Sequence, residues 1–176
     1  MFIAHLPAGY LITQLYLKRQ CFSFAEQHRA WLVGVGLFAS VLPDVDLLYF
    51  YWFDQRQHNH HSYWTHTPVF WLAIFLLPCV VVWITKQKLL LTTIVVLLMN
   101  VMLHLLLDSI AAEILWLYPV VKQSFGLVEV PAQFAWWPLN FLLHWSFMLE
   151  VLIVGTALYQ LKRQYSLKYQ TVNIQS

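Results

Sequence analysis

The sequence predicts an all-α fold, a polytopic membrane bundle of four or five transmembrane helices. Hydrophobic residues make up 60% of the 176 residues and charged residues only 10%, whereas soluble domains carry about 25% charged residues. The mean hydropathy is +0.61, so a soluble chain of this composition could not cover its own surface with polar groups. The composition excludes a soluble globular enzyme and a disordered chain. The net charge of +2 is too small to indicate nucleic-acid binding.

The predicted spans follow from the lengths of the apolar stretches. A helix needs about 20 residues to cross about 30 Å of hydrocarbon. Four stretches reach that length, at residues 30–53, 69–85, 89–112 and 141–161. The opening segment, residues 1–17, is at the short limit and contains Pro7 and Gly9, so both a full span and a re-entrant segment stay open for it.

The rest of the chain connects these spans. Residues 113–139 are aromatic-rich but too interrupted by prolines and charges to cross a membrane. No domain linker is visible, so we expect one membrane-embedded domain over residues 1–176, with residues 162–176 as a cytoplasmic tail.

The orientation follows from the lysine and arginine residues. Eight of the ten lie on one side if every span crosses, and they are Lys18, Arg19, Arg29, Lys86, Lys88, Lys162, Arg163 and Lys168. Only Arg56 and Lys122 fall on the other side. Because cytoplasmic loops are enriched in these residues, we expect an N-terminus outside, a cytoplasmic C-terminus and a multi-pass location in the bacterial inner membrane.

On this topology most histidines and three aspartates share the outer half of the membrane. They are His5, His58, His60, His61, His66, His104 and His144, with Asp44, Asp46 and Asp108. A carboxylate within a span costs a few kcal/mol, and a bound cation would offset that cost. Imidazole nitrogen and carboxylate oxygen are good ligands for zinc or manganese. The sequence therefore predicts a divalent metal site, with more than one ion left open, facing the periplasm.

The spacing of these residues supports a shared site. His104 and Asp108 are four apart, so both side chains leave the same helix face. Pro43 can kink its helix beside Asp44 and Asp46. Gly9, four residues after His5, allows close helix approach. The candidate metal ligands are His5, Asp44, Asp46, His61, His66, His104, Asp108 and His144.

Each motif also has a structural reading. A histidine hydrogen-bonded to a carboxylate one turn away is common without metal, and a Pro-Asp-x-Asp sequence can simply end a helix. Residues 58–61 are most simply a solvent-exposed loop that supplies at most one ligand. Glu150 is left unassigned. The prediction of a metal site rests on the convergence of five segments at one depth.

Four motifs resemble those of YdjM-like proteins, which are predicted inner-membrane metal-dependent hydrolases. The motifs are His5-Leu-Pro-Ala-Gly9, Leu42-Pro-Asp-Val-Asp46, His61-x-x-x-Thr-His66-Thr and His104-Leu-Leu-Leu-Asp108, and the resemblance covers about residues 1–125. That family is in turn similar to zinc-dependent phospholipase C and the S1/P1 nucleases. The relation implies as ligands His5, Asp44 or Asp46, His61 or His66, His104 and Asp108.

These observations predict a membrane-bound metal-dependent hydrolase. We expect it to cleave a phosphoester of a lipid substrate at the outer leaflet, with Asp44 as a ligand and Asp46 as a shared ligand or general base. Two alternatives stay open, an intramembrane zinc amidase of the ceramidase kind and a metal or proton transporter. The predicted inner half offers a transporter few polar groups, namely Glu26, His28 and Glu150. Membrane lipids are the expected partners, and the oligomeric state is left open.

Overall fold

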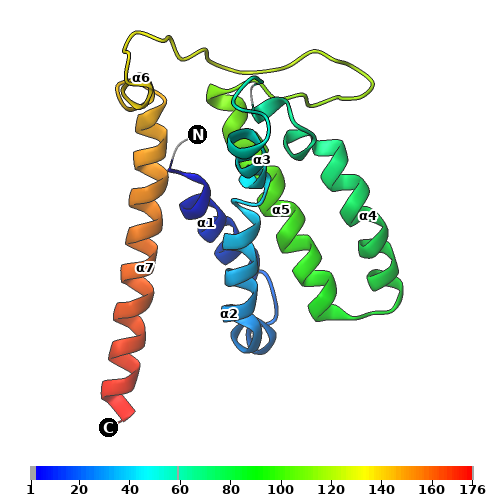
Figure 1. The fold of residues 1–176 in the computed structure, drawn as a ribbon. Helices are drawn as coiled ribbons and strands as arrows, with labels where there is room; N and C mark the ends of the chain where they lie inside the picture. The colour runs from blue at the N-terminus through cyan, green and yellow to red at the C-terminus, as the bar shows by residue number, and fades with distance from the viewer. Residues whose placement is uncertain (1–2, 59, 176) are drawn as a thin grey trace.

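The computed structural model describes residues 3–58 and 60–175, and every regular element in this part of the chain is helical (Figure 1). The elements are α1 (His5–Leu17), α2 (Phe22–Ala39), η1 (Pro43–Val45), α3 (Asp46–Trp52), η2 (His60–Ser62), η3 (Trp64–His66), α4 (Pro68–Ile84), α5 (Lys88–Ala111), α6 (Trp137–Leu142) and α7 (Phe147–Gln175). The predicted all-α fold is confirmed.

Helix α5 is the centre of the bundle. Helices α1, α2 and α4 all pack against it, and α7 packs on α1 (Figure 1). The core includes Ala39 of α2, Trp71 of α4, and Val101 and Leu105 of α5. A helix as apolar as α5 lies in the core of a protein or spans a membrane.

Membrane-span candidates are fewer than expected among the described residues. Only α5 is long and apolar enough by itself, and α2 with the segment Pro43–Trp52 forms a second candidate if the bent pair is one span. Helix α4 is a shorter apolar helix. The number of four or five spans therefore stays a prediction.

The expected kink at Pro43 is confirmed. The predicted span 30–53 is two helices that meet at an angle of 53°. Proline has no N–H to donate and its ring clashes with the preceding turn, so α2 ends at Ala39 and a 3₁₀ turn follows. The break places Asp44 in this turn and Asp46 at the first position of α3.

Close approach of α1 to its neighbours is also confirmed. A Cβ atom at Gly9 would lie 2.5 Å from Cβ of Ser40 and 2.9 Å from Oδ1 of Asn100. No side chain larger than hydrogen fits there, so α1 sits directly against α2 and α5 and brings His5 to the end of α5.

The end of the bundle that holds α3 is covered by a long connection. Residues 112–136 contain no helix and run across this end from α5 to α6 (Figure 1). Helix α7 then leads to the C-terminus at the opposite end. Its helix continues to Gln175, so the predicted tail of residues 162–176 is helical as far as the structure describes it.

Candidate metal centre

Four ligand-type side chains from three segments meet at this end of the bundle. They form the central quartet, Asp44 of η1, His66 of η3, and His104 and Asp108 of α5, and each offers an atom within 4.8 Å of the other three. Nε2 of His104 lies 3.0 Å from Oδ2 of Asp108 and 3.5 Å from Oδ1 of Asp44. Nε2 of His66 lies 3.6 Å from Oδ1 of Asp44 and 3.7 Å from Oδ2 of Asp108.

The ring of His104 is oriented by the backbone of α2. Its Nδ1 lies 2.8 Å from the carbonyl oxygen of Ser40. A carbonyl oxygen only accepts, so Nδ1–H is the donor. In the neutral ring Nε2 then carries a lone pair that is directed at two carboxylates. This Nε2 atom is buried and has no hydrogen-bond partner among the described residues.

The ring of His66 is oriented in the same way by a carboxylate. Its Nδ1 lies 2.7 Å from Oδ2 of Asp46, and the hydroxyl of Thr65 donates to the same oxygen. Nε2 of His66 is buried, faces the quartet and makes no hydrogen bond to any described residue. A histidine that donates one N–H to a carboxylate or carbonyl while its other nitrogen stays open is typical of metal ligands.

Three members of the quartet are buried, and a buried carboxylate among them needs a positive charge nearby. The exposed fraction is 0% for His66, 1% for His104 and 1% for Asp108, and buried carboxylates are costly without a cationic partner. For His66, burial by itself disfavours the imidazolium. The surrounding carboxylates, Asp108, Asp44 and Asp46, outweigh this effect and raise the pKa of the imidazole to about 11. In the cation-free protein a proton thus supplies the charge that a metal ion would supply.

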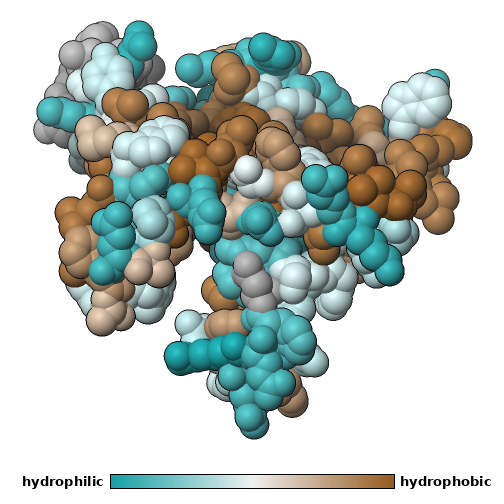
Figure 2. Space-filling model, turned by 90° about the horizontal axis from the view of Figure 1, so that it is seen from above, coloured by the Kyte–Doolittle hydropathy of each residue, from teal (hydrophilic) through white to brown (hydrophobic). Residues whose placement is uncertain are grey.

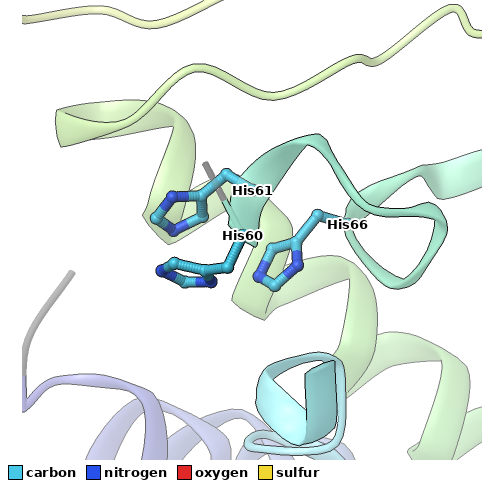
Figure 3. Close-up of side chains that lie close together, drawn as sticks. All are labelled: His60, His61 and His66. Carbon is cyan, nitrogen blue, oxygen red and sulfur yellow. The ribbon is translucent and has the colours of Figure 1, made fainter. Parts of the chain in front are cut away.

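Two neighbouring histidines extend the quartet. His60, His61 and His66 come from one segment and their rings gather in one place (Figure 3). Nε2 of His61 lies 3.7 Å from Oδ2 of Asp108, and Nδ1 of His60 lies 3.7 Å from Oδ1 of Asp46. Burial lowers the pKa of His61 to about 3, so its ring is neutral.

A second group of ligand atoms, from Asp44, Asp46, His60 and His66, shares two members with the quartet. The sequence analysis did not select His60. Spacing within a loop does not fix the direction of adjacent rings, and only the 3₁₀ turn η2 brings both His60 and His61 to the site.

His5 completes the arrangement from α1. Its Nε2 lies 3.1 Å from Oδ1 of Asp108, and its ring stacks on that of His104 with 3.9 Å between the centroids. The carboxylate of Glu150 accepts the backbone N–H groups of Ile3 and Ala4, at 2.5 Å and 3.1 Å. An acidic group is favourable at the start of a helix, so Glu150 holds the first turn of α1, and with it His5, in place.

His144 lies apart from these ligand atoms. Its Nδ1 is 2.9 Å from the hydroxyl oxygen of Ser146, and it belongs to none of the three ligand groups that the described residues form. The structure brings the other seven predicted residues to one place. His58 pairs with Asp54 at 2.8 Å on the surface, as expected for a residue of a wet loop.

A cavity of about 600 Å³ opens beside the quartet. Its polar lining includes His5, Asp44, His60, His61 and Asp108. Its apolar lining includes Leu47 and Phe50 of α3 and Trp137 and Phe141 of α6. Seen from this end, apolar and hydrophilic residues lie side by side across the surface (Figure 2). An amphiphile could therefore place its polar part at the ligands and its apolar part along α3 and α6.

The family described as YdjM inner membrane protein matches residues 1–171, a range that includes every side chain of the central quartet together with Glu150. No curated protein and no solved structure matches the chain. The similarity to phospholipase C and the S1/P1 nucleases stays a prediction.

Proposed function

Because this chain belongs to the family of YdjM inner membrane proteins, we propose that it is a metal-dependent hydrolase that cleaves a phosphoester of a lipid. One observation carries the proposal. Nε2 of His66 and Nε2 of His104 are buried, lack hydrogen-bond partners among the described residues, and face the carboxylates of Asp44 and Asp108.

The donor set fits a divalent cation. Two imidazole nitrogens and two carboxylate oxygens are a combination that suits zinc or manganese, whereas magnesium and calcium prefer oxygen alone. Both imidazoles already donate their other N–H, so no rearrangement of the rings is needed. The second group of ligand atoms gives room for more than one ion. A cation bound here supplies Lewis acidity and makes a nearby water a stronger acid.

The two aspartates Asp44 and Asp46 have different proposed roles. Asp44 lines the cavity, and 27% of its side chain is exposed, so its carboxylate can both bind the cation and accept a proton from the attacking water. Asp46 is 6% exposed and its Oδ2 is occupied by His66 and Thr65. We therefore propose Asp44, rather than Asp46, as the proton acceptor, and Asp46 as the residue that orients His66.

The side of the membrane follows from the charges near the cavity. The two connections at this end of the bundle, residues 53–67 and 112–136, contain Arg56 and Lys122 as their only lysine and arginine residues. Because basic residues mark the cytoplasmic side, the proposal places the site at the outer leaflet, in a multi-pass protein. Helical zinc hydrolases of the phospholipase C kind are its proposed distant relatives.

The decisive test combines metal analysis with a substrate panel. Purified wild type, His104→Ala and a control, His28→Ala, are compared for bound zinc and manganese and for hydrolysis of phosphoester and amide lipids. We expect one or more bound ions in wild type and His28→Ala, loss of metal in His104→Ala, and metal-dependent release of the phosphoester product. Amide cleavage instead would identify an amidase. Bound metal without hydrolysis of either lipid class would reject the hydrolase.

A further inference from the structure

Arg56 is a positively charged residue at the wall of the cavity. Its guanidinium carbon lies 4.7 Å from the centroid of the Tyr51 ring, and its backbone N–H donates to the carbonyl of Phe50 at 3.1 Å. Arg56 and the preceding Gln55 have φ values of 64° and 49°, which lie in the left-handed region that non-glycine residues seldom adopt. This turn directs the chain after α3 back toward the cavity.

Apart from its contact with the ring of Tyr51, the guanidinium of Arg56 has no charged partner in the described part of the chain. Arg56 forms no ion pair there, and the nearest acidic residue in sequence, Asp54, is taken by the backbone N–H and ring of His58, at 2.9 Å and 2.8 Å. A guanidinium presents planar, paired donors that suit phosphate and carboxylate groups. The residue is therefore available to a ligand that enters the cavity.

Much of the cavity lining is apolar. Trp137 and Phe141 project from α6, and Leu47 and Phe50 come from α3. These side chains cannot bind a small anion such as inorganic phosphate. A cavity lined by one arginine, apolar side chains, carboxylates and imidazoles matches an amphiphile whose head group is anionic.

We propose that Arg56 binds the anionic, phosphate-bearing head group of an amphiphile whose apolar part lies against Trp137 and Phe141. Its consequence for catalysis rests on the proposed function, because Arg56 is then the residue that selects the substrate of the hydrolase. Asp44 and Asp108 repel an anionic head group, and the positive charge of Arg56 offsets that repulsion. A neutral or zwitterionic lipid gains less from the same residue.

The test measures binding of a lipid that cannot be hydrolysed. The full chain in detergent is titrated with a dialkyl phosphonate lipid and with the uncharged dialkylglycerol of equal chain length, both with zinc and after chelation. Arg56→Gln should weaken phosphonate binding at least about tenfold, as expected for loss of a charge-assisted hydrogen bond. The dialkylglycerol should bind both proteins equally, and Arg56→Lys should recover part of the affinity.

Matched controls separate the site from the general surface. Lys122→Gln removes the same charge from the same side of the protein, but Lys122 does not line the cavity, so it should bind like wild type. Phe141→Ala should weaken binding of both lipids, whereas Phe134→Ala, also outside the cavity lining, should not. Inorganic phosphate should displace the phosphonate lipid only at far higher concentration.

The results also distinguish this proposal from the hydrolase itself. Equal phosphonate binding by wild type and Arg56→Gln, or equal loss in Lys122→Gln, would overturn the role of Arg56. Displacement by inorganic phosphate at the concentration of the lipid would overturn the lipid part. If the substrate panel shows no hydrolysis while Arg56-dependent binding persists, the hydrolase fails and the binding site stands. If hydrolysis occurs and its kcat/KM is unchanged in Arg56→Gln, the hydrolase stands and the role of Arg56 fails.

Discussion

Nδ1 of His66 and Oδ2 of Asp46 lie 2.7 Å apart, and neither residue is exposed by more than 6%. The two residues are 20 positions apart in the chain, on η3 and α3. Their hydrogen bond fixes the plane of the imidazole and leaves Nε2 directed at the central quartet. The carboxylate also draws the N–H proton toward itself, which makes Nε2 a better ligand. Asp46 would thus act on a bound metal ion through His66.

The first prediction separates the two aspartates of η1 and α3. Asp46→Asn keeps an oxygen that can accept from Nδ1 of His66 but loses the charge, so zinc affinity should fall about 10- to 100-fold. Asp44→Asn replaces a ligand of the quartet and should lose more affinity than that. Competition with a chelating dye measures both constants. Full metal binding and full activity in both variants would remove these aspartates from the site.

The second prediction concerns the helical pair on α5. His104→Ala or Asp108→Ala removes one member of the quartet and leaves the others buried and unbalanced, so each should lower bound metal by more than about 100-fold, above the usual effect of an outer hydrogen-bond partner. His28→Ala on α2 should retain the wild-type content. Metal analysis of the three purified proteins checks the prediction, and equal contents would contradict the assignment.

The third prediction follows from the charge state of His66. Since its pKa is about 11 in the cation-free protein, the imidazole carries a proton throughout the neutral range. A metal ion needs the unprotonated ring, so binding at pH 7 must release at least one proton. Apparent zinc affinity should therefore rise as pH rises and fall as pH falls. Calorimetric titration in buffers of different ionisation enthalpy measures the proton count, and identical heats in all buffers would contradict it.

The fourth prediction tests the support of His5. Glu150→Ala leaves the N–H groups of Ile3 and Ala4 without their acceptor, at a cost of about 1–3 kcal/mol, so the melting temperature in detergent should fall. Zinc affinity should fall as well, because α1 carries His5. Glu150→Gln retains an acceptor oxygen and serves as the matched variant, with a smaller loss of both. A drop in stability with unchanged zinc affinity would show that Glu150 does not position His5.

The fifth prediction concerns topology. In a chain with Cys21 and Cys79 replaced by serine, single cysteines at Gln57 and Gln123 should react with an impermeant thiol reagent in intact cells. A cysteine at Gln87, in the connection between α4 and α5, should react only after the membrane is permeabilised. All three positions are exposed in the structure, so access depends on the membrane alone. The opposite pattern would place the site at the cytoplasmic leaflet.

Much of the site could be predicted from the sequence, because residue spacing in a helix and the position of a proline indicate which side chains lie together. The four-residue spacing of His104 and Asp108 determines a shared helix face, and Pro43 marks the break that exposes Asp44. Two features depend on long-range packing instead. The direction of the His60 ring follows from a 3₁₀ turn between α3 and α4, and the role of Glu150 follows from contact of α7 with α1, 146 positions away.

His144 shows that a shared depth in the membrane does not by itself predict a shared site. It shares the predicted outer half with the other histidines, but it lies between α6 and α7, beside the hydroxyl of Ser146, and belongs to none of the ligand groups of the described residues. Equal depth in a bundle does not imply contact, since the rotation of each helix about its axis and its neighbours decide where a side chain lies.

The candidate ligands lie far apart in the sequence, and this has a consequence for the synthesis of the protein. Asp108 follows His5 by 103 positions, and Glu150, which holds the first turn of α1 in place, comes later still. A nascent chain therefore exposes His5 and the two aspartates around η1 long before their partners leave the ribosome. The cation can be captured fully only after α5 has been inserted, and α1 is secured only when α7 arrives. In the proposed metalloprotein, metal uptake would follow complete insertion, and a chain that stalls before α7 should be open to quality-control proteases at its N-terminal helix.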